Sequence, residues 1–107
     1  MTESESKSAR SGAQQTLQEV YSLLHAMGSV PPAIRFRAEG YLQVILELKL
    51  LSREDVLELI EAAYRDAFDT ALFVGVDQRV QCISPDSQQV RLPVTMVRAP
   101  VYPSTSE

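Results

Sequence analysis

The side chains that most often build catalytic and metal sites are nearly missing from this sequence. It has one histidine, one cysteine and no tryptophan. One His and one Cys cannot supply the usual ligand set of a zinc site. The sequence also has no P-loop, no G-x-S-x-G nucleophile turn, no G-x-G-x-x-G stretch and no C-x-x-C pair. We therefore predict a protein that is not an enzyme and has no catalytic residue, metal, cofactor or small-molecule substrate.

Long hydrophobic runs are also missing. No stretch approaches the ~18 consecutive apolar residues that indicate a membrane helix. The first residues, MTESESKSARSG, are Ser-rich and charged, without the apolar region of a signal peptide. A lone thiol cannot form an intrachain disulfide, and it is typical of a reducing compartment. These features predict a cytoplasmic protein without a membrane partner.

Positive charge is in short supply. The chain has 10 Lys and Arg against 14 Asp and Glu, which gives a net charge of −4. A general attraction to nucleic acid is therefore absent. Residues 53–69 could be mistaken for the recognition helix of a helix-turn-helix, but they carry six acids and two arginines. Such a helix would repel phosphates, so DNA binding is the less favoured function and no nucleic-acid partner is expected.

Helical periodicity is the main positive signal. Apolar residues recur at spacings of three and four in segments that begin at Ala13, Pro32 and Arg53 and end near residues 27, 51 and 70. Gly28 stands where a C-terminal cap belongs, and Pro32 suits the first turn of a helix. Ser52 and Asp55 resemble a capping box at the start of the third helix. Three helices are predicted.

The sequence changes character after Gly75. RVQCIS (79–84) and QVRLPVTMV (89–97) resemble two short strands joined by the turn-like SPDSQ (84–88). Pro93 cannot donate to a strand ladder, so its strand is expected at an edge or in an extended arm. Cys82 is expected to be a small buried hydrophobic residue.

Together these segments predict one small domain. The fold class is mainly α, with a minor β contribution: a three-helix core with a C-terminal short β-hairpin or extended arm. Residues 1–12 have almost nothing to bury and are predicted to be a disordered tail. Residues 13–98 form the single helical domain with its C-terminal strands, and residues 99–107 form an extended tail.

The predicted helix 32–51 is apolar on two sides. One stripe contains Ile34, Ala38, Tyr41, Val44, Ile45, Leu48 and Leu51, and the neighbouring helices can cover it. A second stripe contains Leu42, Leu46 and Leu50, and it needs a cover of its own. Either the C-terminal hairpin covers this second stripe, or the stripe is an intermolecular surface, as a homodimer seam or a docking site. Both hold if the hairpin is exchanged between protomers.

A further set of apolar side chains lies at the end of the third helix. Leu72 and Phe73 break its pattern on the side that faces water, and Phe68 lies close by. We predict that they join the second stripe as anchors of a protein interface, since a few buried aromatic or aliphatic side chains carry most interface energy. Alternatively, Phe73 folds back under the hairpin as a core residue.

The stretch VPPAIRFRAEGYLQVILELKLLSREDVLELIEAAYRDAF (30–68) resembles the small QslA-type quorum-sensing antiactivators of Gram-negative bacteria. The resemblance implies a homodimer that binds a LuxR-type transcription factor and blocks that factor's dimerisation and DNA binding. It carries over no contact residues, because no short motif aligns them. The alternative function is a small dimeric adaptor or secretion-type chaperone, which also uses acidic helical surfaces.

Overall fold

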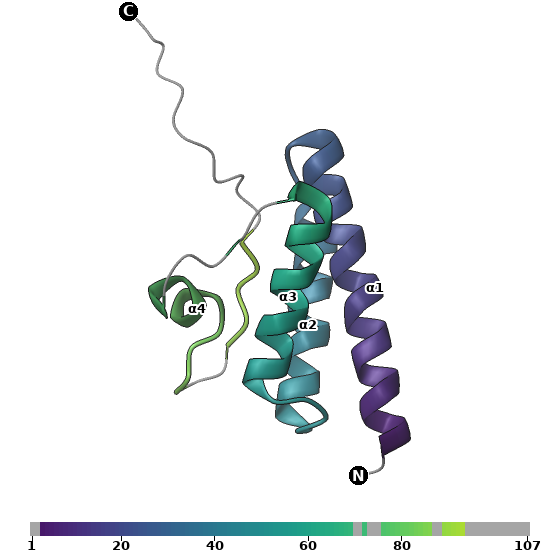
Figure 1. Cartoon of the computed structure of the whole chain (residues 1–107), viewed down its shortest axis with the longest axis vertical. Coiled ribbons are helices and arrows are strands. Elements are labelled where there is room, and N and C mark those ends of the chain that lie inside the picture. Colours follow the sequence, from purple (N-terminus) through teal and green to yellow (C-terminus); the bar gives the residue numbers. More distant parts are fainter. Residues whose placement is uncertain (1–2, 70–71, 73–75, 87–88, 94–107) are drawn as a thin grey trace, which may run out of the picture.

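The computed structural model describes residues 3–69, 72, 76–86 and 89–93. This part of the chain is mainly helical, as predicted, and contains no strand longer than a single bridge. The helices are α1 (Glu3–Met27), α2 (Pro32–Glu47), α3 (Arg53–Phe68) and α4 (Val76–Cys82). Helix α1 packs against both α2 and α3, and the three run up, down and up along one common direction (Figure 1).

Helix α1 begins ten residues earlier than the sequence pattern indicates, at Glu3 instead of Ala13. The prediction of a disordered segment is therefore wrong for residues 3–12. Ala9 is only 6% exposed and continues the buried stripe of Ala13 and Leu17 by one more turn. The hydroxyl of Ser6 also donates to the carbonyl of Leu50 at 3.2 Å. The side chains that pack in this part of α1 are small, so a search of the sequence for large apolar residues does not detect them.

Helix α2 ends at Glu47, before the predicted Leu51, because the chain turns back towards α3. Lys49 adopts a left-handed conformation with φ 58°. The Lys49 N–H donates to the carbonyl of Leu46 at 3.1 Å, and the Leu50 N–H donates to the carbonyl of Ile45 at 3.0 Å. These two bonds form a Schellman motif, with lysine at the position that usually holds glycine.

Helix α3 begins as predicted. The Asp55 N–H donates to the Ser52 hydroxyl at 3.1 Å, and the Ser52 N–H donates to Asp55 Oδ2 at 3.3 Å. This reciprocal pair confirms the capping box, with aspartate as the acidic member. The helix ends at Phe68, and Asp69 follows it in the left-handed region.

The first predicted strand is largely helical. Residues 79–82 belong to α4, which corrects the strand predicted for 79–84. Only Ile83 pairs in the antiparallel sense, with Val90, and the Arg91 N–H bonds to the carbonyl of Cys82 at 2.8 Å. Residues 94–97, the remainder of the second predicted strand, and the predicted tail 99–107 lie outside the described residues.

Residues 83–86 and 89–93 close the core on the side of α2 and α3 that faces away from α1 (Figure 1). Arg53 Nε of α3 donates to the carbonyl of Ile83 at 2.9 Å. On α2, Gln43 Oε1 accepts from the Val90 N–H at 3.0 Å, and Glu39 Oε2 accepts from the Leu92 N–H at 2.7 Å. Two polar side chains of α2 thus hold an irregular backbone segment against the helix.

Candidate functional site

The two apolar stripes of α2 differ in how far their side chains are exposed. Leu42 is fully buried and Leu46 is 4% exposed, whereas Tyr41, Val44 and Leu48 are 40%, 50% and 60% exposed. Of the two covers considered for the second stripe, the chain itself provides the cover along the helical part of the stripe. The first stripe, which the neighbouring helices were expected to cover, is partly open, although its Ala38, Ile45 and Leu51 are buried. This corrects the alternative in which Leu42 and Leu46 form an intermolecular surface: the exposed apolar residues of α2 belong to the first stripe.

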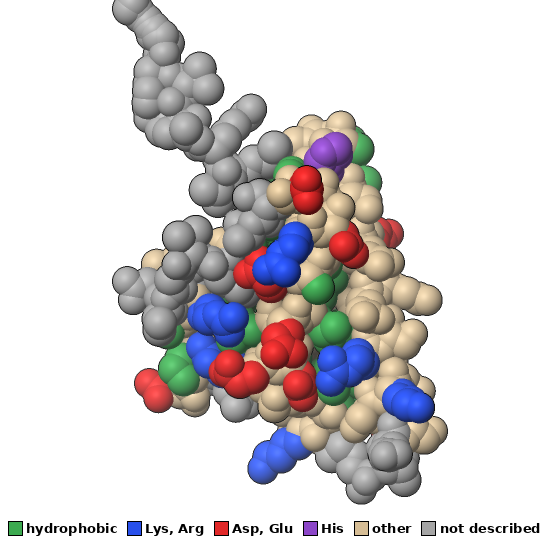
Figure 2. All heavy atoms as spheres, in the orientation of Figure 1, with side chains coloured by type: hydrophobic (Ala, Val, Ile, Leu, Met, Phe, Trp, Pro, Cys, Tyr) green, Lys and Arg blue, Asp and Glu red, His purple; other side chains and the backbone are tan. Residues whose placement is uncertain are grey.

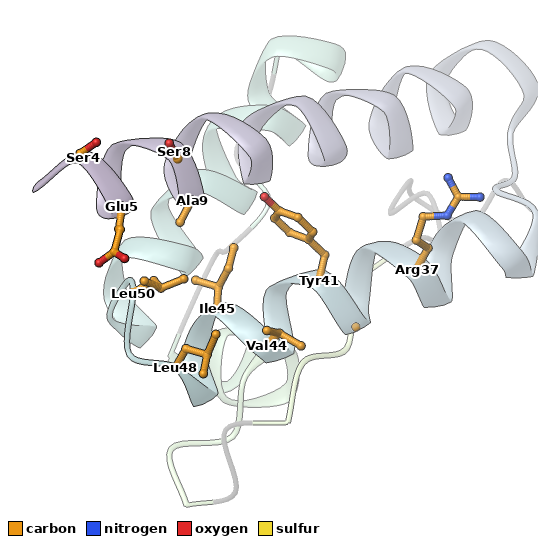
Figure 3. Close-up of a pocket in the computed structure, with 11 residues that line it drawn as sticks. Ser4, Glu5, Ser8, Ala9, Arg37, Tyr41, Val44, Ile45, Leu48 and Leu50 are labelled. Carbon is orange, nitrogen blue, oxygen red and sulfur yellow. The ribbon is translucent and has the colours of Figure 1, made fainter. Parts of the chain in front are cut away.

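A groove runs along this exposed side, between α2 and the N-terminal half of α1 (Figure 3). Its volume is about 760 Å³. Its lining residues come from α1, from α2 and from the turn after α2, and they are Ser4, Glu5, Ser8, Ala9, Arg37, Gly40, Tyr41, Val44, Ile45, Leu48 and Leu50. The surface is mainly apolar, with charged groups at its two ends.

Tyr41 bridges the two walls of the groove. Its side chain extends from α2 towards α1 (Figure 3), and a Cβ added at Gly12 of α1 would overlap the Tyr41 hydroxyl. The absence of a side chain at Gly12 therefore lets the tyrosine lie across α1. Gly40 differs, because a Cβ there would meet nothing within 4 Å. Gly40 leaves a hollow on the exposed face of α2.

Charges of opposite sign mark the two ends of the groove. Arg37 lies near the start of α2, and Glu5 lies at the other end, where it points towards Leu50 (Figure 3). Glu47 is exposed at the end of α2 and accepts a hydrogen bond from Gln43 Nε2 at 3.4 Å. A partner in the groove would thus meet the Arg37 cation at one end and the Glu5 carboxylate at the other, while Glu47 lies outside the lining.

The residues predicted as interface anchors separate into different environments. Leu50 is partly buried and lines the groove. Leu72 is 7% exposed, and its N–H donates to Glu61 Oε2 at 2.8 Å, so it is a core residue. Phe68 is partly buried; its ring stacks on Tyr64 at 4.6 Å and meets His25 edge-on at 5.2 Å. Phe73 lies outside the described residues.

The groove residues that sequence reasoning missed carried a detectable signal. Arg37, Tyr41, Val44 and Leu48 recur at spacings of four, three and four along one helical line. A charged residue on that line indicates contact with water, whereas Leu42 and Leu46 are flanked by residues that offer hydrogen-bond acceptors.

Burial raises the pKa of two titratable side chains in the core, Cys82 and Tyr21. Burial, reinforced by Glu39 and opposed by Arg53, raises the pKa of the Cys82 thiol from 9.0 to about 12. Burial also raises the pKa of the Tyr21 hydroxyl well above its ordinary value, with smaller contributions from Cys82, Tyr64 and Glu39. The Tyr21 oxygen has no hydrogen-bond partner among the described residues. Within those residues, no cluster of three or more His, Cys, Asp or Glu could hold a metal ion. A thiolate is needed for nucleophilic attack, and Cys82 stays protonated near neutral pH.

The exposed face of α3 presents a mixture of charges (Figure 2). Arg65 pairs with Glu61 at 3.4 Å one turn away, and Glu54 pairs with Arg53 at 2.9 Å and with Arg79 of α4 at 3.7 Å. Such surface pairs contribute little to stability. They neutralise part of the acidic face, and they provide no continuous basic surface for a phosphate backbone.

In the part of the chain that the structure describes, none of the helices is both long enough and apolar enough to cross a membrane. No protein-family model, curated protein or solved structure matches the chain.

Proposed function

We propose that this protein is a non-enzymatic regulator that binds another protein in the groove between α1 and α2. The observation that carries the proposal is the exposed line of Tyr41, Val44 and Leu48, which leaves apolar area uncovered along about two turns at the end of α2. Large apolar side chains exposed side by side in a groove are typical of interaction sites. Isolated exposed side chains, such as Val80 of α4, need no such explanation.

The form of the groove favours a helix as the bound element. Two antiparallel helices form its walls, and the residues Ser8 and Ala9 of α1 and Gly40 of α2 are small enough for a third helix to approach closely. An amphipathic helix would lay its apolar face on Val44 and Leu48, in the helix-in-groove mode of recognition. Tyr41 would supply an aromatic anchor at one end of the contact.

The resemblance of residues 30–68 to QslA-type antiactivators supports a narrower proposal for the partner. In this proposal the partner is a LuxR-type transcription factor, and the bound protein blocks its dimerisation and thereby its DNA binding. The acidic surface of α3 supports a mode of action without contact to DNA. Such a partner places the protein in the cytoplasm, where a single reduced thiol such as Cys82 is common.

The test measures binding of the full chain to a purified ligand-binding domain of a LuxR-type activator by calorimetry. Val44→Glu places a charge in the centre of the groove, so we expect its affinity to fall by at least about tenfold, or ~1.4 kcal/mol. The matched control is Val80→Glu, at an apolar position of α4 that is 41% exposed. This control should bind like the wild type.

Two outcomes would contradict the proposal in different ways. If Val44→Glu bound as tightly as the wild type, the groove would not be the binding site. If the wild-type chain failed to bind, the LuxR-type partner would be wrong. Capture of an effector or a secretion component would then favour the adaptor or chaperone alternative.

A further inference from the structure

We propose that the groove between α1 and α2 also binds a linear fatty acid, with its carboxylate at Arg37 and its alkyl chain along Tyr41, Val44 and Leu48. The fatty acid is bound and not converted, so the site needs no catalytic residue. Binding of the fatty acid stands apart from the proposed function. Its regulatory consequence rests on that function, because the fatty acid and the helix of the partner would share one groove.

Arg37 provides a cation for the carboxylate at one end of the groove. Its side chain is exposed and extends from α2 towards α1 (Figure 3). Among the described residues, none of the carboxylates forms an ion pair with Arg37, whereas Arg35 pairs with Glu39 at 3.1 Å. A guanidinium matches a carboxylate through two parallel hydrogen bonds. The charge of Arg37 is therefore complementary to an anionic head group.

Beyond Arg37 the α2 wall of the groove suits an alkyl chain. Tyr41, Val44 and Leu48 are exposed along it, and the Tyr41 hydroxyl lies close to α1 at Gly12. Apart from this hydroxyl, the described α2 side chains that line the groove beyond Arg37 have no hydrogen-bonding group. A sugar or a nucleotide would lose hydrogen bonds to water on such a wall, whereas an alkyl chain has none to lose.

The dimensions of the groove set the length of the chain. Arg37 and Leu48 are eleven positions apart, which corresponds to about 16 Å along α2. An extended alkyl chain advances about 1.25 Å per carbon, because C–C bonds of about 1.5 Å meet at tetrahedral angles. A chain of about 12–14 carbons therefore spans this distance. The carboxylate of Glu5 at the far end would repel the head group, which leaves it at Arg37.

The net charge of the protein makes the head group informative. The chain carries a net charge of −4, so nonspecific attraction favours a cationic amphiphile over an anionic one. A preference for a carboxylate over an ammonium group on the same alkyl chain therefore requires a local cation. Arg37 is the cation that lines the groove.

A bound fatty acid would regulate the partner site. The fatty acid and the partner's helix both need Val44 and Leu48, so a groove that holds one excludes the other. At a fatty acid concentration about ten times its dissociation constant, the apparent affinity for the partner falls about tenfold, because only the empty fraction is competent to bind. Partner binding is thereby linked to the supply of free fatty acid.

Calorimetry of the full chain with octanoate, decanoate and dodecanoate, each below the concentration at which it forms micelles, tests the proposal. A fully buried methylene tightens binding about fourfold. Val44 is 50% exposed, which indicates cover on one side only, so we expect about twofold for each methylene. Dodecylammonium should bind at least about tenfold more weakly than dodecanoate, despite the net charge of −4.

Variants separate the head-group contact from the alkyl contact. Arg37→Gln should weaken dodecanoate at least about tenfold and keep the dependence on chain length. Val44→Glu should weaken all three fatty acids. Arg91→Gln removes the same charge at an exposed position outside the groove, so it should bind like the wild type, as should Val80→Glu. Circular dichroism of each variant verifies its helical fold.

Three results would overturn the proposal: a wild type without saturable binding of dodecanoate, equal affinities for octanoate and dodecanoate, or an Arg37→Gln variant that binds as tightly as the wild type. Sedimentation with phosphatidylcholine vesicles is a further arm. Vesicle binding that Val44→Glu abolishes would identify a membrane surface as the apolar partner and would also overturn it.

The proposed function is tested separately, with the LuxR-type domain titrated in the presence and absence of dodecanoate. If the domain binds and the fatty acid does not, only the fatty acid site is refuted. If the fatty acid binds and the domain does not, only the proposed function is refuted. If both bind, saturating dodecanoate should weaken the domain, and an unchanged affinity would overturn the regulatory role.

Discussion

The two sides of α2 are made of similar residues and yet differ in what covers them. On one side Leu42 and Leu46 are buried, and the side chains of Glu39 and Gln43 accept hydrogen bonds from Leu92 and Val90. On the other side Val44 is half exposed, beside the groove. The two sides cannot be distinguished by their apolar residues alone. They differ in the polar residues that lie beside each stripe.

An irregular segment can cover an apolar surface only if its own backbone groups find hydrogen-bond partners. Glu39 and Gln43 supply acceptors for two such N–H groups next to Leu42. On the groove side, neither Arg37 nor Gly40 of α2 can accept a hydrogen bond through its side chain, and the carboxylate of Glu5 and the hydroxyl of Ser8 belong to α1. A helix satisfies its own backbone, so the groove side is suited to a helix and the covered side to an extended chain.

The largest expected contrast compares truncation on the two sides. Leu42→Ala removes a fully buried side chain and should lower the free energy of unfolding by about 2–5 kcal/mol. Val44→Ala removes a half-exposed side chain and should change it by no more than about 0.5 kcal/mol when the protein is monomeric. Urea denaturation at low protein concentration measures both. Equal losses in the two variants would show that the sides do not differ.

A second variant tests how the covered side is closed. Glu39→Ala removes the carboxylate that accepts from the Leu92 N–H and also pairs with Arg35 at 3.1 Å. The unpaired N–H should cost about 1–3 kcal/mol, and the Leu92 amide should exchange its hydrogen faster. Hydrogen exchange followed by NMR provides the measurement, and Glu47→Ala on the exposed side is the control. Unchanged protection of Leu92 would mean that Glu39 does not hold the segment.

A smaller gain is expected where α2 ends. Lys49 is left-handed in the Schellman turn, a conformation that costs a residue with a Cβ about 1 kcal/mol relative to glycine. Lys49→Gly should therefore raise the thermal midpoint by a few degrees, about 4–8 °C per kcal/mol for a domain of this size. A lowered thermal midpoint would argue against the left-handed conformation of Lys49 in the turn between α2 and α3.

The smallest effect compares two glycines that face the groove. Gly40→Ala meets open space and should stabilise the monomer by about 0.5–1 kcal/mol through higher helix propensity. Gly12→Ala should stabilise the protein less, because the Tyr41 side chain must move to make room for the added Cβ. Thermal unfolding of the two variants is a matched pair. A larger gain at Gly12 than at Gly40 would contradict the position of Tyr41.

Sequence patterns were sufficient for the helices whose ends carry local signals. Ser52 and Asp55 mark the start of α3, and Pro32 marks the start of α2. The beginning of α1 could not be placed in the same way, because Ala9 and Ser6 contribute packing and a hydrogen bond without hydrophobic bulk. In α4, seven residues are too few for a helical period to be distinguished from the alternation of a strand.

The candidate site shows a different limit. A helical wheel orders the apolar residues of α2 around its axis but does not indicate which of them a distant segment will cover. That outcome depends on the return of residues 89–93 to α2, and on hydrogen bonds across 47 positions from Gln43 to Val90 and 53 from Glu39 to Leu92. The sequence therefore left open whether the C-terminal hairpin or another protein covers Leu42 and Leu46, and it predicted that the neighbouring helices cover Tyr41 and Val44. In the structure Leu42 and Leu46 are buried within the chain, whereas Tyr41 and Val44 are 40% and 50% exposed.

The most direct test of the groove as an interaction surface follows both sides of α2 in one experiment. In a protein labelled at Leu and Val methyl groups, NMR spectra are recorded while a purified LuxR-type ligand-binding domain is added to concentrations well above a micromolar dissociation constant. We expect the Val44 and Leu48 methyl signals to shift as the domain is added, while those of Leu42 and Leu46 stay in place. Shifts confined to Leu42 and Leu46, or an unchanged Val44 signal while calorimetry shows binding, would contradict the account.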